Sequence, residues 1–433
     1  MEPIEPVEPF EYDNAAGAIR FGRGSAGELA SVLGAHDVKR ALVVCGTNVG
    51  ANRGTMAPIE GGLDGRLAGV FDETTPAKSA RTAVDGVEAM RSTEADGLVA
   101  VGGGSSVDVA RAMRAIHAGG RPYGELCAHA VDTGALPVPE ADLAPLVAVP
   151  TTLAGADLSA GGSVTFDADD AANADGRDAG GDGSGGGGAD TDGDGADGDG
   201  GEDVVAGFSD PALLPEATVY DPDLFETTPT GALVGSAMNG FDKGLELPYS
   251  RHANPLTDAA ALRGLGLLRS SLPRLREYDD PAVMDAAVVG IVCVQYGRVT
   301  RGPGLLSIVH AFGHGLREQG VQQGVAHAVM APPVLDYLFS VVDGRRSLLA
   351  DALGTGDGRG SETDDPAGAV VEAVRAVRDG LELPARLREL EAVEREALPA
   401  VAEAVHGDRF LDNGPAGLDP SVGDAEGVLE DAW

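Results

Sequence analysis

The 433-residue sequence is poor in lysine, cysteine and aromatic residues. Only Lys39, Lys78 and Lys243 are lysines among 31 basic residues, against 69 acidic ones. The three cysteines are widely spaced and form no CxxC pair, which favours a reducing compartment over a disulfide framework. A net charge of −38 excludes the basic surface that binds nucleic-acid phosphates or anionic lipid. We expect neither nucleic acid nor a membrane as a partner.

Long apolar runs and targeting signals are also missing. The longest strongly apolar run, near 286–294, is too short to span a bilayer. The N-terminal segment MEPIEPVEPFEYD has no basic region and no apolar region of the signal-peptide kind. We therefore expect a cytoplasmic protein with a small-molecule substrate.

The acidic residues are too many for one acidic tail to explain. Residues 167–203 hold thirteen acids and one arginine, less than a third of the net charge. At low salt a charge of −38 would destabilise the compact state, whereas molar salt shortens the Debye length to about 3 Å. An ordinary protein with one acidic segment is the alternative. The composition favours halophilic adaptation to a salty cytoplasm.

The N-terminal half alternates short apolar runs with helical patterns, which predicts βαβ units and a parallel sheet. The expected strands are 41–45, 67–71, 97–101 and 146–149, with a helix over 80–90. Residues 167–203 are nearly all Asp, Gly and Ala and cannot bury enough apolar surface to offset their ordering entropy. We expect this insert to be disordered, at the tip of a hairpin formed by 161–166 and 204–208.

After Asp221-Pro222 the sequence has helical patterns with few β-branched runs. We predict an α/β domain over 1–223 and an all-α domain over 224–433. The expected helices are 229–250, 254–272, 280–300, 304–319, 324–341, 366–381 and 387–405.

A glycine-rich loop follows the predicted strand 97–101 and precedes a helix. It reads GGGSSVDVAR, beginning at Gly102. Glycines let backbone N–H groups approach a phosphate, and the helix N-terminus adds about half a positive charge. A plain tight turn is the alternative. The loop predicts a pyrophosphate site, although it is not the common GxGxxG fingerprint.

This loop resembles the GGGSxxDxA cofactor loop of the iron-containing alcohol dehydrogenase superfamily. The segment PTTLAGAD at 150–157 resembles that family's PTT segment, and its maleylacetate reductase-like branch is the most similar. The resemblance covers nearly the whole chain outside the acidic insert. It implies the dehydroquinate synthase-like fold of that family, with NAD or NADP between a dinucleotide-binding domain and a helical domain.

The resemblance also assigns residues to the cofactor. The residues that the resemblance places against the cofactor phosphates are Gly102, Gly103, Gly104, Ser105, Asp108, Thr151 and Thr152. Family members that prefer NAD often have an Asp after the strand that corresponds to 41–45. That place is taken here by Gly46, followed by Thr47 and Asn48. Without that carboxylate a 2′-phosphate is not repelled, so NADP is plausible.

The family's metal is bound by one Asp and three His, and most of these are replaced here. Asn239 stands at the Asp position, Lys243 and Gln323 stand at two His positions, and His310 remains. Neutral amide oxygens are poor ligands for iron or zinc, and a protonated lysine repels a cation. We expect a weakened or absent metal site. A set formed by His310, His314 and His327 stays open as an alternative.

We hypothesise that the Lys243 ammonium replaces the metal as the electrophile that stabilises the substrate oxygen. Asn239 lies four residues before it on the same helix face, and His310 and His314 could relay a proton. The alternative for Lys243 is a pair with an acid on a solvated face, and for the histidines it is a buried, hydrogen-bonded pair.

The predicted function is NAD(P)-dependent hydride transfer between an alcohol and a carbonyl compound. Maleylacetate reductase-like enoate reduction and a nucleotide-binding protein without turnover are the alternatives. A dehydroquinate synthase-like lyase would need an intact metal and more basic residues than this chain has. Family members are often dimers, so a homodimer is possible.

Overall fold

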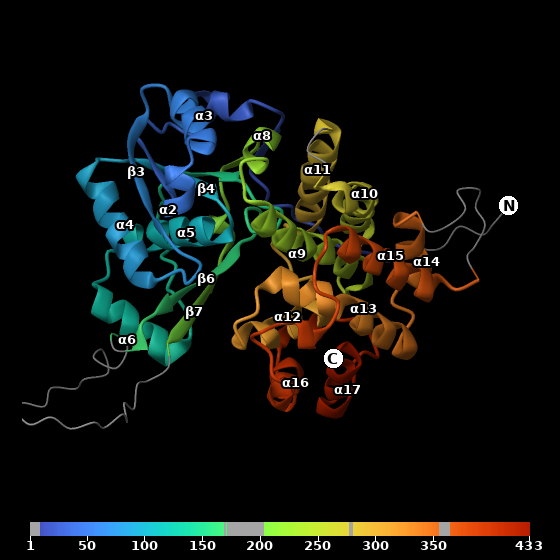
Figure 1. Ribbon diagram of the computed structural model, residues 1–433. Coiled ribbons are helices and arrows are strands. Elements are labelled where there is room, and N and C mark those ends of the chain that lie inside the picture. The colour runs from blue at the N-terminus through green and yellow to red at the C-terminus, as the bar shows by residue number, and fades with distance from the viewer. Residues whose placement is uncertain (1–8, 169, 171–202, 277–279, 355–363) are drawn as a thin grey trace, which may run out of the picture.

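A parallel β-sheet forms the centre of the N-terminal lobe, and helices form the C-terminal lobe (Figure 1). The computed structural model describes residues 9–168, 170, 203–276, 280–354 and 364–433. Most of the insert predicted to be disordered, 167–203, lies outside the described residues.

Within the described residues the sheet has six strands in the order β1-β8-β5-β4-β2-β3, and all neighbours are parallel. The strands are β1 (Ala18–Phe21), β2 (Ala41–Gly46), β3 (Leu67–Thr74), β4 (Gly97–Gly102), β5 (Leu146–Pro150) and β8 (Ala217–Tyr220). From β2 the chain passes to β3 at one edge of the sheet, and it then returns to β4 on the other side of β2 and continues to β5 and β8 towards the opposite edge. This reversal places the usual ligand-binding edge of such sheets at the carboxyl ends of β2 and β4.

Both faces of the sheet are buried, which explains the continuous apolar runs of its strands. Alternate side chains of β2, such as Val43 and Cys45, pack with one helix layer, and Leu42 and Val44 pack with the other. The first layer contains α1 (Leu29–Gly34), α2 (Thr47–Ala51), α3 (Arg53–Leu63) and α8 (Pro222–Phe225), and the second contains α4 (Ala80–Ser92), α5 (Gly104–Gly119) and α6 (Tyr123–Thr133).

The predicted hairpin is confirmed. Strands β6 (Gly161–Phe166) and β7 (Val204–Ser209) pair antiparallel, from Gly161 opposite Ser209 to Phe166 opposite Val204. The hairpin projects from the α/β lobe, below α4 and beside α6 (Figure 1).

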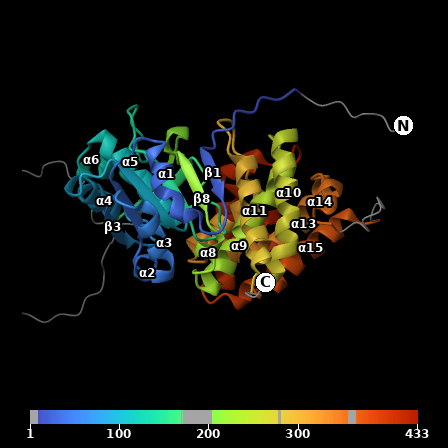
Figure 2. The same cartoon turned by 90° about the horizontal axis from the view of Figure 1, so that it is seen from above.

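The helical lobe packs around a large apolar core. Its helices are α9 (Thr230–Tyr249), α10 (Pro255–Ser271), α11 (Pro281–Arg298), α12 (Ile308–Glu318), α13 (Gln323–Val341), α14 (Arg346–Ala352), α15 (Pro366–Gly380), α16 (Leu398–His406) and α17 (Val422–Ala432). Helix α13 is long and apolar enough to cross a bilayer, but 67% of that stretch is buried inside the protein, as in the core helix of a globular domain. From above, α9, α11 and α10 lie side by side next to the sheet (Figure 2).

The predicted class, an α/β domain with a parallel sheet followed by a helical domain, is confirmed. The predicted boundary at 223/224 falls within the short helix α8, Pro222–Phe225, which packs with the sheet, and before α9, which begins at Thr230. One predicted helix is wrong in extent: 387–405 is helical in the α form only from Leu398, after two 3-10 turns. Pro399 favours the first turn of a helix, so the helix begins there.

Candidate active site

The glycine loop forms a tight turn from β4 into α5. Gly102 has φ +131°, which disfavours any residue with a side chain, and Gly103 caps α5, which begins at Gly104. Ser105 lies in the first helical turn, and the buried Ser106 hydroxyl lies 3.1 Å from Thr74 Oγ1. The first N–H groups of α5 therefore point out at the carboxyl edge of the sheet, where they can bind phosphate oxygens.

The segment after β5 lies against this loop. The Thr151 amide donates to Gly102 O at 3.0 Å, and a methyl group added to Gly103 would lie 3.3 Å from the Thr152 hydroxyl. The structure thus brings together the glycine loop and the two threonines that the sequence assigned to the cofactor phosphates.

Asp108 lies deeper than these residues. Its carboxylate is 2.6 Å from Lys78 Nζ and 3.3 Å from Arg111 Nη1, and the side chain is almost fully buried. Because these two cations occupy the carboxylate, Asp108 is suited to holding α5 in place, not to binding a phosphate.

The residues at the carboxyl end of β2 lie at the same edge of the sheet. Gly46 ends β2, and Thr47 begins α2 with its hydroxyl donating to Asp72 O at 2.8 Å. Asn48 is exposed. The sequence predicts that this turn faces the adenosine ribose, and its position beside β4 fits that assignment.

Lys243 lies on α9, the helix of the C-terminal lobe that lies next to the N-terminal lobe in Figure 1. Its ammonium donates to Ala154 O at 2.7 Å and to Gly155 O at 3.0 Å, and only 6% of the residue is exposed. Burial and, to a smaller extent, the nearby Arg298 lower the pKa of Lys243 to about 7, although Asp157 opposes them. An ammonium has three donors, so two are used on the loop after β5 and one remains.

A buried histidine–carboxylate pair lies near Lys243. His310 Nδ1 on α12 is 2.5 Å from Glu246 Oε2 on α9, and the Val309 amide donates to Glu246 Oε1 at 2.8 Å. Burial raises the pKa of Glu246 and lowers the pKa of His310, which disfavours the charged form of each group. The His310 Nε2 atom is buried and has no hydrogen-bond partner among the described residues.

A second buried pair lies beside it. His327 Nδ1 on α13 is 2.9 Å from Asp242 Oδ2, but their orientation is not that of a hydrogen bond. Burial raises the pKa of Asp242 and lowers that of His327 to about 3, which disfavours the charged form of each group. The His327 and His310 rings are 4.4 Å apart between centroids, and Gln323 Nε2 lies 3.0 Å from His327 Nε2.

The other two predicted catalytic residues, His314 and Asn239, lie in different surroundings from His310. His314 Nδ1 lies 2.7 Å from Asp408 Oδ2, and its side chain is 35% exposed, so it sits nearer the solvent than His310. Hydrogen bonds from His314 and from the Phe410 amide hold the pKa of Asp408 low, although burial opposes them. The Asn239 side-chain oxygen is buried without a hydrogen-bond partner in the part of the chain that the structure describes.

The residues at the family's metal positions do not fit a resident divalent metal. They offer two amides, an ammonium and a single imidazole, and the ammonium repels a cation. For the alternative set, the His310 ring lies 4.4 Å from that of His327 and 6.4 Å from that of His314, but no group of three His, Cys, Asp or Glu side chains among the described residues is arranged to hold a metal ion. His310 and His314 are each engaged by a carboxylate.

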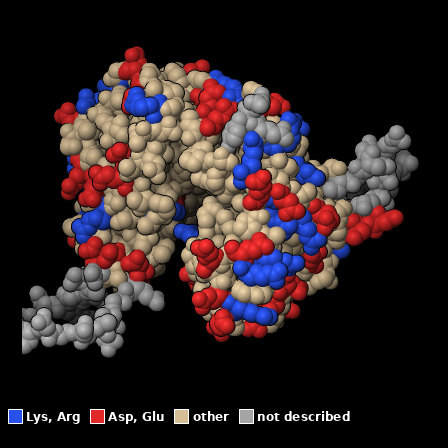
Figure 3. All heavy atoms as spheres, viewed as in Figure 1, with Lys and Arg blue, Asp and Glu red and all other residues tan. Residues whose placement is uncertain are grey.

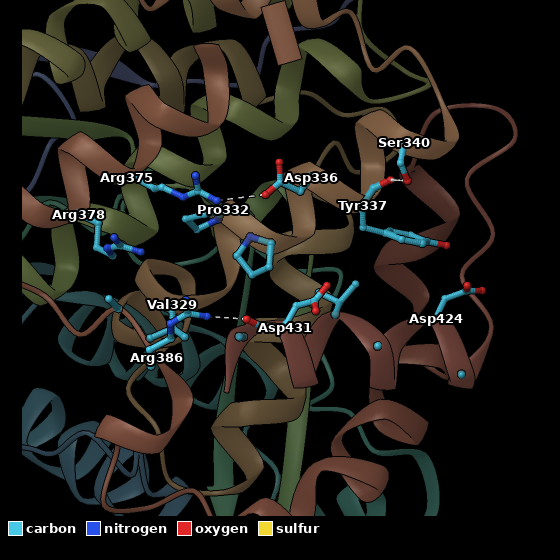
Figure 4. Close-up of a pocket in the computed structure, with 16 residues that line it drawn as sticks. Val329, Pro332, Asp336, Tyr337, Ser340, Arg375, Arg378, Arg386, Asp424 and Asp431 are labelled. Atoms are coloured by element: carbon cyan, nitrogen blue, oxygen red, sulfur yellow. Dashed lines mark hydrogen bonds and ion pairs between the residues drawn. The ribbon is translucent and has the colours of Figure 1, made fainter. Parts of the chain in front are cut away.

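The protein has two hollows, one between the lobes and one within the helical lobe. Figure 3 shows the surface hollowed between the two lobes, with blue Lys or Arg atoms at its inner end. A hollow of about 910 Å³ lies elsewhere, between α13, α15 and α17 (Figure 4). There Arg375 pairs with Asp336 at 3.2 Å and Arg386 donates to Asp431 O at 2.6 Å. None of its lining residues belongs to the predicted site.

Comparisons with known proteins agree with this geometry. Residues 16–174 match the family described as "Iron-containing alcohol dehydrogenase", and residues 234–423 match "Fe-containing alcohol dehydrogenase family, C-terminal". A maleylacetate reductase of Rhizobium sp. (strain MTP-10005) is 25% identical over 82% of this chain and 83% of its own length. A 4-hydroxybutyrate dehydrogenase of Cupriavidus necator is 28% identical over 82% of this chain and 83% of its own length.

A solved structure shows the same fold. The sulfoacetaldehyde reductase of Bifidobacterium kashiwanohense, in complex with NAD+, superimposes with a TM-score of 0.75 at 17% identity, covering 98% of this chain and 99% of that one. The chain therefore belongs to the iron-containing alcohol dehydrogenase family and is an oxidoreductase of that family.

Several residues of the site were not predicted from the sequence. The bond between Glu246 and His310 was not expected, nor was the position of Asp242 beside His327. Arg298 and Gln295 on α11 were not singled out, because nothing in the local sequence shows that this helix end lies near Lys243.

Proposed function

We propose that this protein is an NAD(P)-dependent oxidoreductase that interconverts an alcohol and a carbonyl compound without a resident metal, with the Lys243 ammonium acting on the substrate oxygen. The observation that carries the proposal is the position of Lys243 Nζ, held by two backbone carbonyls at the interlobe junction. Bound nicotinamide supplies or accepts the hydride.

The remaining N–H of Lys243 can donate to the oxygen of a carbonyl substrate. A fixed donor in a water-poor site stabilises the negative charge that develops on that oxygen, and one such donor contributes about 10²–10³ in rate. His310 Nε2 has no partner among the described residues. The His310 ring lies 4.4 Å from that of His327, and the Lys243 charge acts on it electrostatically. In alcohol oxidation this Nε2 atom can take the proton of the substrate hydroxyl while Glu246 stabilises the imidazolium that forms, and in carbonyl reduction the same proton returns to the substrate oxygen.

The glycine loop, Thr151 and Thr152 would hold the cofactor pyrophosphate. Gly46, Thr47 and Asn48 would face the adenosine ribose, and the missing carboxylate there leaves NADP open beside NAD. Two relatives bear on the cofactor: a Bacillus methanolicus relative is described as NAD-dependent methanol dehydrogenase, and the sulfoacetaldehyde reductase structure contains NAD+. Enoate reduction, as the maleylacetate reductase relatives suggest, is a variant of the same hydride chemistry.

The composition supports further proposals. We propose a cytoplasmic enzyme of a salty cell with a small-molecule substrate and with neither nucleic acid nor a membrane as partner. The homodimer that the family resemblance implies stays a prediction.

The test is metal analysis and activity on the same sample. Protein purified in high salt is treated with chelator, its iron and zinc are quantified, and oxidation of NADH and NADPH is followed with a panel of aldehydes, ketones and enoates. We expect reduction of at least one carbonyl compound with much less than one metal per chain. Activity that returns only on adding Fe²⁺ or Zn²⁺ contradicts the proposal. Cofactor binding without any turnover supports the nucleotide-binding alternative.

A further inference from the structure

A second cation lies near Lys243 at the end of α11. Arg298 is half-buried, and its Nη1 donates to Gln295 Oε1 at 2.9 Å. Gln295 itself is fully buried, and its Nε2 has no hydrogen-bond partner among the described residues. The amide oxygen of Gln295 therefore holds the guanidinium, and this bond accounts for the orientation of the Gln295 side chain.

Arg298 is connected to Lys243 through direct contacts. The Gln295 side chain fills the space beside Gly155, where an added methyl group would collide with it, and Gly155 O accepts from Lys243 Nζ. Gly155 has φ +65° and follows the segment that carries Thr151 and Thr152. The contacts thus run from the cofactor segment to Lys243 on one side and to Arg298 on the other.

Neither cation has a carboxylate partner within ion-pair distance among the described residues. By contrast, the fully buried Arg111 is paired with Asp108 and the fully buried Arg114 with Glu216. Asp157, the carboxylate that acts on Arg298 electrostatically, already accepts a hydrogen bond from the Tyr220 hydroxyl.

An unpaired, half-buried guanidinium is costly unless a ligand supplies the negative charge. Burial lowers the pKa of Arg298 to about 10, although Asp157 opposes the change, so the group stays charged at neutral pH. Its proximity also lowers the pKa of Lys243, which means that the two charges repel each other. An anion between them would relieve both effects.

We propose that Arg298 is a substrate-binding residue that selects carbonyl substrates carrying a carboxylate. This inference rests on the proposed function. The guanidinium binds the carboxylate at the end away from the reacting carbon, and its planar fork matches the two carboxylate oxygens. Lys243 contacts the carbonyl oxygen at the other end, so the two cations orient the substrate between them. Gln295 positions Arg298.

The test compares two four-carbon aldehydes, 4-oxobutanoate and butanal, which differ only in the carboxylate. We expect the wild-type protein to show at least a tenfold higher kcat/KM for 4-oxobutanoate. Arg298→Gln should lower kcat/KM for 4-oxobutanoate by 10- to 100-fold, mainly through KM, and change that for butanal less than threefold. Arg301→Gln, three residues further on and exposed, is the matched control and should change neither. A preference for butanal, or equal losses for both aldehydes in Arg298→Gln, would overturn the proposal.

A binding measurement separates this proposal from the proposed function. The fluorescence of bound NADH is titrated with succinate, which cannot be reduced at a carbonyl. We expect succinate to bind the wild-type complex and to bind Arg298→Gln at least tenfold more weakly. Succinate binding without turnover of either aldehyde would defeat the proposed function and leave the role of Arg298 standing. Turnover of butanal with no succinate binding would defeat the role of Arg298 alone. If NADH does not bind, both fail.

Discussion

At the scale of single residues, the site depends on Lys243 and its buried neighbours. Burial disfavours the charged forms of Asp242, His327, Glu246 and His310. Lys243 is therefore the group whose charge can act on a substrate oxygen near neutral pH. This differs from a lysine on a solvated face, the alternative considered from the sequence, because only 6% of Lys243 is exposed.

The protonation of Lys243 predicts how reduction depends on pH. Its pKa is lowered from 10.5 to about 7, so the ammonium form predominates well below pH 7, is half lost at about pH 7, and falls further as the pH rises. We expect kcat/KM for carbonyl reduction to be level at lower pH and to fall about tenfold per unit above about pH 7.

Lys243→Arg separates this effect from the pH dependence of the reaction itself. Arginine stays charged throughout this range, so the variant should lose the fall between pH 7 and 9, whatever its absolute rate. The measurement is initial rate at low substrate from pH 5.5 to 9.5. The same alkaline fall in both proteins would show that another group is responsible.

At the residue scale, the sequence predicted site residues only where a family pattern fixed their positions. Asn239, Lys243 and His310 were assigned in this way, and their roles stay predictions. The partners of these residues could not be assigned, since His310 lies 64 residues from Glu246 in sequence. Arg298 was missed for the same reason: its importance comes from contacts between α11 and the segment after β5.

At the scale of elements, the turn between β4 and α5 is the proposed site for the cofactor phosphates. The sequence predicted it because three signals are adjacent: a fully apolar strand, three glycines and a helical pattern. Strands β1 and β8 were missed because each has only four residues. Helix α16 was predicted too long, because its apolar spacing continues upstream of Pro399 into residues that form 3-10 turns.

The packing of this turn predicts the effect of a small substitution. A methyl group at Gly103 would lie 3.3 Å from Thr152 and would narrow the space for a phosphate. We expect Gly103→Ala to weaken NADH binding about tenfold, equivalent to about 1.4 kcal/mol, with the fold retained. Gly61→Ala, on α3 with nothing within 4 Å, is the control and should leave binding unchanged. NADH fluorescence titration measures both, and equal affinity in the two variants would argue against a phosphate site at this turn.

At the scale of the whole molecule, acidic side chains are scattered over the visible face of both lobes (Figure 3). The net charge of −38 makes self-repulsion a property of the entire chain, and no single ion pair can offset it. The composition was sufficient to predict this feature, since it does not depend on the fold.

Salt should therefore stabilise the protein. Because the Debye length falls from about 10 Å at 0.1 M to about 3 Å at 1 M, we expect the unfolding midpoint to rise steadily as KCl increases from 0.1 to 2 M. The measurement is thermal unfolding followed by circular dichroism. Sorbitol at matched osmolality is the control, because it does not screen charge and should give a smaller rise. An unchanged or lower midpoint in KCl would contradict the halophilic interpretation.

The most direct test of the account is the rate of hydride transfer in a single turnover of chelator-treated wild-type protein and Lys243→Met, each preloaded with NADH. The account predicts that the metal-free wild type reacts, and that Lys243→Met is slower by about 10²–10³ with its NADH dissociation constant within threefold of wild type. A variant that reacts at the wild-type rate, or a wild type that is inert until a divalent metal is added, would contradict the central role of Lys243.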